Sequence, residues 1–404
     1  MSSIASTSAS TMQHPRYSIF THSVGYHTSK HGLLSKLDAI SAAGLAGVEM
    51  FTDDLWSFAQ SDEFGSILAA SERETELLTP PDSPLSQPAS LRNKTRIHEN
   101  AERAGQHYSA HGACTPDERQ REIAAATFIR SYCASRRLQV ECLQPLRDVE
   151  GWLKDEDREN AIERVKSRFD IMRALDTHLL LICSQNTRAP QTTGDMATIV
   201  RDLTHISDLA AAYTAQTGFE IKIGYEALSW GAHIDLWSQA WNIVRTVDRD
   251  NIGLILDSFN TLAREFADPC TRSGIQEPIC TTLTSLHSSL QAIQSVPADK
   301  IFLLQIGDAR RLPEPLVPSP RDGEPRPSRM IWSRSSRLMP CETDKGGFMP
   351  VAQFVKSVVN AGYSGPWSIE VFNSELEQPG VHVQNSFALR ARQGLDRLLE
   401  VVFA

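Results

Sequence analysis

The chain has 404 residues, of which 41% are hydrophobic and 22% charged, so it can bury a sizeable core as one large domain or two ordinary ones. Its formal net charge of -9 argues against nucleic acid or an anionic membrane surface as a partner, because both require a broad positive field. No apolar stretch of about 18 residues, long enough to span a membrane, occurs in the sequence. A small metabolite is therefore the expected partner of a soluble protein.

The cysteines and the N-terminal residues indicate in which cellular compartment the protein is expected. Seven cysteines, an odd number, include no C-x-x-C pair, which fits a reducing cytoplasm better than a secreted disulfide scaffold or a zinc site. Residues 1–16 are rich in Ser and Thr and lack the apolar segment of a signal peptide. We expect a cytoplasmic protein with a flexible tail over 1–16 and a single catalytic domain over 17–404.

Short apolar runs alternate with amphipathic stretches along the chain. The runs, which we predict to be strands, are residues 17–24, 46–51, 138–145, 178–184, 219–226, 251–257, 300–308 and 366–372. Stretches such as 159–175 and 195–215 carry apolar residues at helical spacing. This alternation predicts parallel strands buried on both faces, and eight such units favour a (β/α)8 TIM barrel over an open doubly wound sheet. The absence of a G-x-G-x-x-G motif after any run also argues against a dinucleotide-binding sheet.

Two segments interrupt this pattern. Residues 61–116 include "TPPDSPLSQPAS" and are predicted to be a long, partly disordered insertion after the second strand. Residues 312–329 form a Pro-rich loop after the seventh strand. Because the loops at the carboxyl ends of barrel strands surround the active site, this loop is a candidate lid, with a solvated surface excursion as the alternative.

Four late strands end in a side chain that carries oxygen: Glu226, Asp257, Gln305 and Glu370. In a barrel these strand ends lie side by side on one rim, where the carboxylates would repel one another without a cation. All four are hard oxygen ligands, which favours Mg²⁺ or Mn²⁺ over zinc. A single acid at a strand end is more often a helix N-cap or a solvated loop residue, but four in consecutive strands favour a metal site.

Six short sequence motifs carry a family resemblance. They are "VEMFTDDL" (48–55), "LQPLRDVEGW" (143–152), "IGYEALSWG" (223–231), "LILDSFN" (254–260), "MIWSRSSRLMP" (330–340) and "SIEVFN" (368–373). In these motifs the chain resembles the sugar-phosphate isomerase-like TIM barrels, also called xylose isomerase-like. Within that group it resembles the 3-dehydroshikimate dehydratases of quinate and shikimate catabolism. The resemblance spans roughly residues 17–400 apart from the insertion.

The resemblance implies roles for particular residues. It implies one divalent metal ion, Mg²⁺, Mn²⁺ or Co²⁺, held by the four strand-end residues named above, and substrate binding by Arg147, Ser333 and Arg337. Guanidinium groups suit the carboxylate of 3-dehydroshikimate, although a surface ion pair is the alternative for Arg147 and solvated charge is the alternative for Arg337.

One position departs from the bacterial pattern. Asn260 stands where bacterial members have a histidine base, while fungal members resemble this chain in having Asn. Asparagine cannot accept a proton at neutral pH, so we assign Asn260 to substrate binding and leave the base open. His233 is the first candidate, His22 and a metal-bound hydroxide are others, and for each histidine a structural role is the alternative.

The main functional hypothesis is a lyase that converts 3-dehydroshikimate to protocatechuate and water by an enolate-type elimination. The alternatives are a sugar isomerase or epimerase or an inosose dehydratase on the same barrel, and a ligand-binding homologue that has lost its chemistry. The sequence leaves the preferred metal, the oligomeric state and the role of residues 61–116 open.

Overall fold

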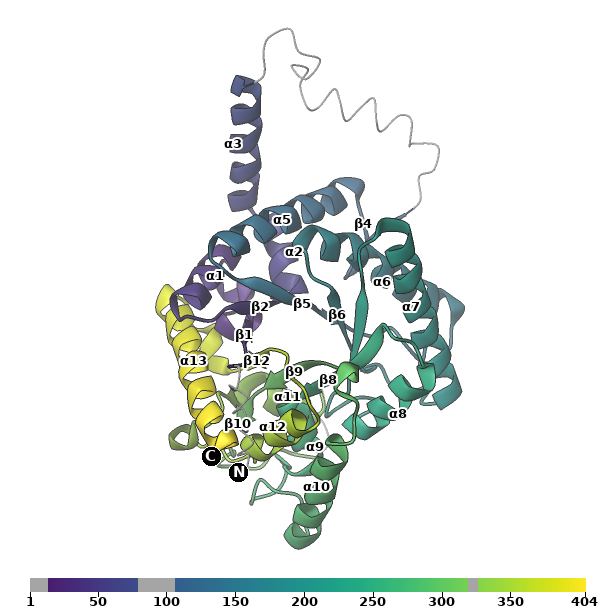
Figure 1. Cartoon of the computed structure of the whole chain (residues 1–404), viewed down its shortest axis with the longest axis vertical. Helices are drawn as coiled ribbons and strands as arrows, with labels where there is room; N and C mark the ends of the chain where they lie inside the picture. The colour runs from purple at the N-terminus through teal and green to yellow at the C-terminus, as the bar shows by residue number, and fades with distance from the viewer. Residues whose placement is uncertain (1–13, 79–105, 319–325) are drawn as a thin grey trace, which may run out of the picture.

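The computed structural model describes residues 14–78, 106–318 and 326–404. These residues form a closed barrel of parallel strands surrounded by helices (Figure 1), which confirms the predicted (β/α)8 TIM barrel. Around the barrel the strands follow the order β1 (Tyr17–Phe20), β12 (Trp367–Ile369), β9 (Ile301–Ile306), β8 (Ile252–Asp257), β7 (Lys222–Glu226), β6 (Leu179–Cys183), β5 (Gln139–Leu146) and β2 (Gly47–Phe51).

Each predicted apolar run overlaps a barrel strand, but several strands are shorter than their run. The run 17–24 holds only the four residues of β1, because the chain leaves the barrel rim in the 3-10 helix η1 (Thr21–Val24). The run 366–372 holds only the three residues of β12. Apolar composition marks burial rather than strand geometry, so buried residues just beyond a strand were included in the predicted strand.

Helices join successive strands and cover the outside of the barrel. They are α1 (Leu33–Ala42), α2 (Thr52–Gln60), α5 (Pro116–Ser135), α6 (Asp155–Leu175), α7 (Met196–Thr217), α8 (Trp237–Val247), α9 (Ser258–Glu265), α10 (Ile279–Ile293), α12 (Val351–Asn360) and α13 (Val381–Phe403). Polar side chains begin three of them: Thr115 forms a capping box with Glu118 at α5, and the side chains of Asp195 at α7 and Asp257 at α9 accept from the backbone N–H groups of Thr198 and Phe259.

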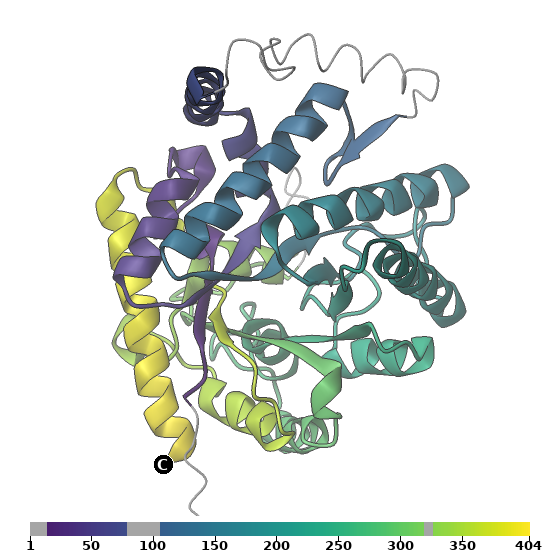
Figure 2. The ribbon, with the colours of Figure 1, turned by 45° about the horizontal axis from the view of Figure 1, so that its top comes forward.

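The two ends of the described chain close the ring. Strand β1 pairs with β12 on one side and with β2 on the other. Figures 1 and 2 show α13 lying along α1, and these helices contact each other. The apolar core is continuous from the strands to the helices, and every residue of β6 and β8 is buried. The strand ends that carry the predicted site are thus held by neighbours on both sides.

The two interrupting segments are partly described. Within the predicted insertion 61–116, the first part forms helix α3 (Asp62–Leu78), with Asp62 and Glu63 in the first turn, where acids favour helix formation. The hairpin of β3 (His107–Ser109) and β4 (Gly112–Cys114) precedes α5, while 79–105 lies outside the described residues. The predicted loop 312–329 gives way at Ser328 to helix α11 (Ser328–Ser336), and 319–325 also lies outside.

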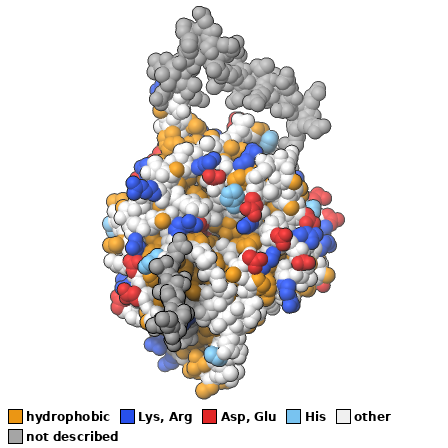
Figure 3. All heavy atoms as spheres, in the orientation of Figure 1, with side chains coloured by type: hydrophobic (Ala, Val, Ile, Leu, Met, Phe, Trp, Pro, Cys, Tyr) orange, Lys and Arg blue, Asp and Glu red, His pale blue; other side chains and the backbone are white. Residues whose placement is uncertain are grey.

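The surface carries charged side chains of both signs. On the face drawn in Figure 3, Lys and Arg side chains are interspersed with Asp and Glu, so charge of each sign is distributed over that face. Among the described helices, none is long and apolar enough to cross a membrane. Most of the predicted N-terminal tail, residues 1–13, lies outside the described part of the chain.

Stability of the helical layer is expected to depend on a fully buried ion pair. Glu122 on α5 accepts from the Arg168 guanidinium on α6 at 2.6 and 3.0 Å, and both side chains are 0% exposed. Glu122→Gln leaves Arg168 charged and buried, so we expect it to lower the unfolding free energy by about 3–5 kcal/mol in urea titrations. The control Glu163→Gln, in an exposed pair with Lys166, is expected to change it by less than about 0.5 kcal/mol. Equal effects of the two substitutions would contradict the assignment.

Candidate metal centre and substrate site

Three carboxylates meet at the carboxyl end of the barrel. Glu226 ends β7, Asp257 ends β8 and Glu370 directly follows β12, and all are buried. One oxygen of each lies within 4.8 Å of the others, although 144 residues separate the first from the last in the sequence numbering. The strand register sets Gln305 opposite Asp257 on one side and opposite Ser368 on the other. The fold thus brings together the four strand-end residues that the sequence singled out.

The cluster holds more negative charge than its protein partners balance. Burial raises the pKa of Glu226 well above its usual range, and the charges of Glu370 and Asp257 raise it further. Burial raises the pKa of Asp257 to about 7 even though Arg337 opposes the shift. The Arg337 Nη1 donates to Asp257 Oδ2 and Glu370 Oε2, both at 2.9 Å. One guanidinium against three carboxylates leaves a site that favours an added cation.

Gln305 completes a donor set suited to such a cation. Its Nε2 donates to Glu49 Oε2 at 2.8 Å and to Glu370 Oε1 at 3.2 Å. Its Oε1 is buried and has no hydrogen-bond partner among the described residues. A buried amide oxygen without a partner is costly, and coordination to a metal would satisfy it. Four oxygen donors fit a hard divalent ion held by Glu226, Asp257, Gln305 and Glu370.

Glu49 orients the Gln305 amide, and it was not among the site residues predicted from the sequence. It is fully buried on β2, and its carboxyl also accepts from Gln144 Nε2 at 2.9 Å and from the Ser368 hydroxyl. Burial and the neighbouring Glu370 raise the pKa of Glu49 to about 8. Because its Oε2 accepts the Gln305 N–H, the amide oxygen of Gln305 is left for a metal. The only sequence feature that could have identified Glu49 as a site residue is its position in the motif "VEMFTDDL".

Asn260 serves the carboxylates. Its Nδ2 donates to Glu226 Oε1 at 2.7 Å and to Asp257 Oδ2 at 2.9 Å, and its Oδ1 accepts from the Ser229 backbone N–H. Both ends of the amide therefore have protein partners. The structure gives Asn260 a role in holding two of the clustered carboxylates, and its predicted contact with substrate stays a prediction.

The predicted substrate-binding residues lie at two levels. Ser333 and Arg337 are buried together, with the Ser333 hydroxyl accepting from Arg337 Nε at 3.1 Å, and Arg337 reaches the carboxylates below. Arg147 is half-buried at the edge of a cavity of about 460 Å³ that Asp53, His111 and Trp152 also line. The structure therefore places Arg337 within the metal cluster and Arg147 nearer to solvent.

Arg334 is a further arginine at this end of the barrel. It is half-buried, with its guanidinium 4.9 Å from the Phe372 ring centroid. Burial, together with the nearby charges of Arg147 and Arg337, lowers the pKa of Arg334 to about 10. Neither Arg147 nor Arg334 forms an ion pair within the described part of the chain. These two guanidinium groups are available for an anionic ligand.

His233 lies apart from the carboxylates in its contacts. Its Nε2 is 2.9 Å from the Thr192 hydroxyl, and its ring packs against Gly194. Neither residue belongs to the carboxylate cluster. Sequence distance from Glu226 was the basis for choosing His233, and its role as the base stays a prediction that the observed contacts do not support.

The chain belongs to the xylose isomerase-like TIM barrel family, whose model matches residues 113–399. Among curated relatives, the 3-dehydroshikimate dehydratase of Neurospora crassa is 29% identical over 95% of this chain and 94% of its own length. The 3-dehydroshikimate dehydratase of Pseudomonas aeruginosa is 35% identical over 61% of this chain, a match that spans 31% of that longer protein. Inosose isomerase of Bacillus licheniformis matches a shorter part, 29% of this chain at 30% identity.

Solved structures agree with the fold. A xylose isomerase-like TIM barrel/4-hydroxyphenylpyruvate dioxygenase fusion protein superposes with a TM-score of 0.62 and 26% identity over 96% of this chain and 44% of its own. The IolI protein, solved with a bound zinc atom, gives a TM-score of 0.57 at 15% identity, over 96% of this chain and 98% of its own, and shows the fold alone.

Replacing Glu226 by Gln is expected to weaken metal binding with little effect on folding. The substitution removes one charge at nearly constant volume, and a neutral amide is a poorer ligand for a hard dication. We expect the dissociation constant for Mn²⁺, measured by calorimetry on stripped protein, to rise by about 100-fold or more. Glu220→Gln, at an exposed position shortly before β7, is the matched control. Equal affinity of wild type and Glu226→Gln would disprove the metal site.

The metal-free protein is expected to lose stability as the pH rises from 5 to 8. Burial raises the pKa of Glu150 to about 7, and one of its oxygens has no partner among the described residues. The folded state keeps this proton after the unfolded state, with a pKa of about 4.3, has lost it, so stability falls over that interval. Glu49 contributes in the same sense.

Thermal melts in EDTA across this pH range measure the effect. Glu150→Gln removes one raised carboxyl and should reduce the slope by up to about 1.4 kcal/mol per pH unit between the two pKa values. Glu163→Gln, an exposed site, should leave the slope as it is. A stability that rises from pH 5 to 8 in the metal-free protein would contradict the assignment.

Proposed function

We propose that this chain is a metal-dependent 3-dehydroshikimate dehydratase, which forms protocatechuate and water. The relative of that name from Neurospora crassa matches it over nearly the whole of both chains. The oxygen ligands at the strand ends suit a divalent ion such as Mg²⁺, Mn²⁺ or Co²⁺. The substrate carries a carboxylate, a ketone and ring hydroxyls, so it needs both a cation for the ketone and a receptor for the carboxylate.

The geometric observation that carries the proposal is the pair of half-buried arginines without an ion-pair partner in the described chain, Arg147 and Arg334. Burial is the main cause of the lowered pKa of Arg334, and repulsion from Arg147 adds to it. A substrate carboxylate would relieve that repulsion. Guanidinium groups grip such a carboxylate through paired N–H donors. A neutral sugar offers no charge to this pair, which favours an acidic substrate over the polyols of the epimerases.

The reaction divides between the metal and the side chains. When bound by Glu226, Asp257, Gln305 and Glu370, the ion would supply positive charge to the ketone oxygen. Asn260 and Arg337 hold three of these ligands in place through the hydrogen bonds described above. A base takes the proton from the ring carbon between the ketone and the departing hydroxyl, that hydroxyl leaves as water, and a final proton shift from the ring methylene to the ketone oxygen makes the ring aromatic.

Two alternatives remain distinguishable. Inosose or sugar chemistry on the same barrel is the second enzymatic candidate, and the shorter match to inosose isomerase is its support. A ligand-binding protein without turnover is the third, and the amide at position 260 is its support. As to location, all seven cysteines are free, which is consistent with action in a reducing cytoplasm.

Incubation of stripped protein with 3-dehydroshikimate and Mg²⁺, Mn²⁺ or Co²⁺ tests the function. We expect the ultraviolet absorbance of protocatechuate to appear with at least one ion and to vanish in EDTA. Ligand-induced thermal stabilisation without product would instead identify a binding protein. Turnover of inosose or ketohexose substrates in place of 3-dehydroshikimate would support the second candidate.

Truncating the arginine pair tests how the substrate is recognised. Because a hydrogen bond to a charged group is worth about 1.5–3 kcal/mol, Arg147→Ala or Arg334→Ala should raise KM for 3-dehydroshikimate by roughly 10- to 150-fold. Metal affinity should stay unchanged, since neither side chain contacts the carboxylates. Arg173→Ala, at an exposed site on α6, is the control. An unchanged KM in both variants would remove the basis for an acidic substrate.

A further inference from the structure

A buried histidine, His22, stands at the catalytic end of the barrel without a hydrogen-bond partner. It belongs to η1, which directly follows β1, and is 9% exposed. Its Nδ1 is fully buried, and no partner for it exists in the described part of the chain. A buried polar nitrogen without a partner costs free energy, so its retention calls for an explanation.

Aromatic rings hold the imidazole in one orientation. It stacks on Tyr26 with ring centroids 4.1 Å apart and contacts Phe51 at 4.4 Å. Phe372 lies 5.6 Å from it by centroid. The same Phe372 ring carries the Arg334 and Arg337 guanidinium groups, each 4.9 Å from its centroid. One aromatic ring therefore separates His22 from the arginines that border the metal cluster.

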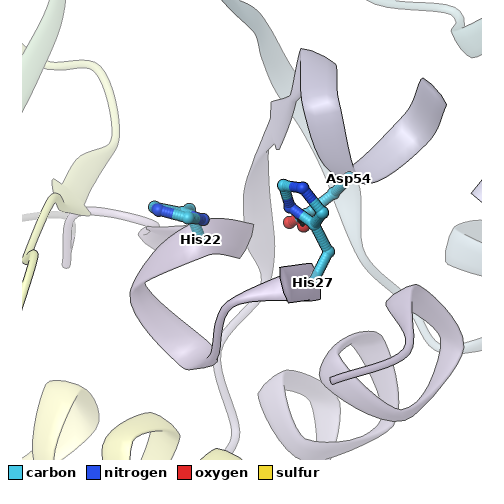
Figure 4. A group of neighbouring side chains, drawn as sticks. All are labelled: His22, His27 and Asp54. Carbon is cyan, nitrogen blue, oxygen red and sulfur yellow. Dashed lines mark ion pairs between the residues drawn. The ribbon is translucent and has the colours of Figure 1, made fainter. Parts of the chain in front are cut away.

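A second metal site does not explain this histidine. His22, His27 and Asp54 have ligand atoms within 4.8 Å of one another. Lys36, fully buried, already donates to Asp54 Oδ1 at 2.7 Å, and the Thr21 hydroxyl donates to the other oxygen. Figure 4 shows His27 and Asp54 directed toward each other, with the His22 ring to one side of them. The Lys36 ammonium already balances the charge of this single carboxylate, so the group lacks the excess negative charge that would favour a dication.

Neither Asn260 nor His233 supplies the proton acceptor that the reaction proposed above needs. Both ends of the Asn260 amide are hydrogen-bonded, and an amide cannot accept the proton. His233 contacts Thr192 and Gly194. We propose that His22 is the base that removes the proton next to the ketone of the substrate, an inference that rests on the proposed dehydratase function.

The surroundings keep His22 in the form that accepts a proton. Burial lowers the pKa of the imidazole well below its usual range, and the charges of Lys36 and Arg334 lower it further. Asp54 opposes this shift, but its charge is shared with Lys36. The ring is neutral at neutral pH, so one nitrogen carries a lone pair for the substrate.

The proton balance of the step is closed. The neutral imidazole takes the proton from the ring carbon, and the C–H electron pair moves into the ring toward the ketone. The imidazolium then returns a proton to the departing hydroxyl, which leaves as water, so His22 ends the elimination as it began. The remaining proton shift, from methylene to ketone oxygen, is driven by aromaticity and requires no further reactant.

Kinetics of wild type, His22→Asn and the control His27→Asn test the proposal. The control lies in the same cluster, contacts Asp54 and has a side chain that is 27% exposed. We expect His22→Asn to lower kcat by about 100-fold or more, with KM and calorimetric Mn²⁺ affinity changed by less than about threefold. His27→Asn should keep at least half of the wild-type kcat. A His22→Asn enzyme that keeps a third or more of kcat would overturn the proposal.

Chemical rescue by added imidazole distinguishes a catalytic role of His22 from a role in packing alone. In His22→Ala, added imidazole should restore turnover, and among substituted imidazoles the restored rate should rise with the basicity of the free base. Loss of activity without rescue would assign His22 a packing role, and rescue of His233→Ala instead would assign the base to His233. If His22→Asn or His22→Ala fails to fold by circular dichroism, His22→Phe, which suits the aromatic surroundings, takes its place, and full activity of that variant overturns the proposal.

The same assays distinguish failure of the inference from failure of the function. Absence of protocatechuate from the wild type with all three ions rejects the dehydratase and with it the role of His22. Turnover by the wild type together with unimpaired turnover by His22→Asn rejects only the role of His22.

Discussion

The burial of four carboxyl groups at one end of the barrel is the constraint on which the rest of the site depends. Glu49, Glu226, Asp257 and Glu370 are all at most 4% exposed. Isolated buried charges of one sign are too costly to persist, so each must be protonated, paired or coordinated to a metal. Arg337 pairs with two of them, and the amides of Asn260 and Gln305 donate to the others. The remaining negative charge favours the binding of a cation at this cluster.

Charge is arranged in layers above this cluster. Arg337 belongs to the lower layer, because its guanidinium touches the carboxylates directly. Arg147 and Arg334 belong to an upper layer without carboxylate partners in the described chain. An anionic substrate that carries a ketone could meet the upper layer with its carboxylate and the metal with its ketone oxygen. The rings of Phe372 and Tyr26 pack against His22 beside these arginines.

The strands were more predictable than the segments between them. Apolar runs of four to eight residues are visible in the sequence because both faces of a barrel strand are buried. Ends were less certain, since residues 21–24 are as buried as β1 but turn into a 3-10 helix. Composition did not single out the helix α3 (Asp62–Leu78) within the predicted insertion, because polar and charged residues are good helix formers as well as common in disordered segments.

Sequence by itself determined the barrel, the family and the four oxygen-bearing side chains at the strand ends, because each follows from a local pattern: periodicity, a short motif, or a residue at the end of a run. Tertiary structure decided which side chains meet. Only the closed barrel brings Glu49 beneath Gln305 and aligns its amide, although 256 residues separate them. Only packing distinguishes Arg337, which contacts carboxylates, from Arg334, which does not. Packing also distinguishes His22, which lies beside Phe372, from His233, which contacts Thr192. Hydrogen bonds, burial and repulsion depend on distances through space, which spacing along a chain does not specify.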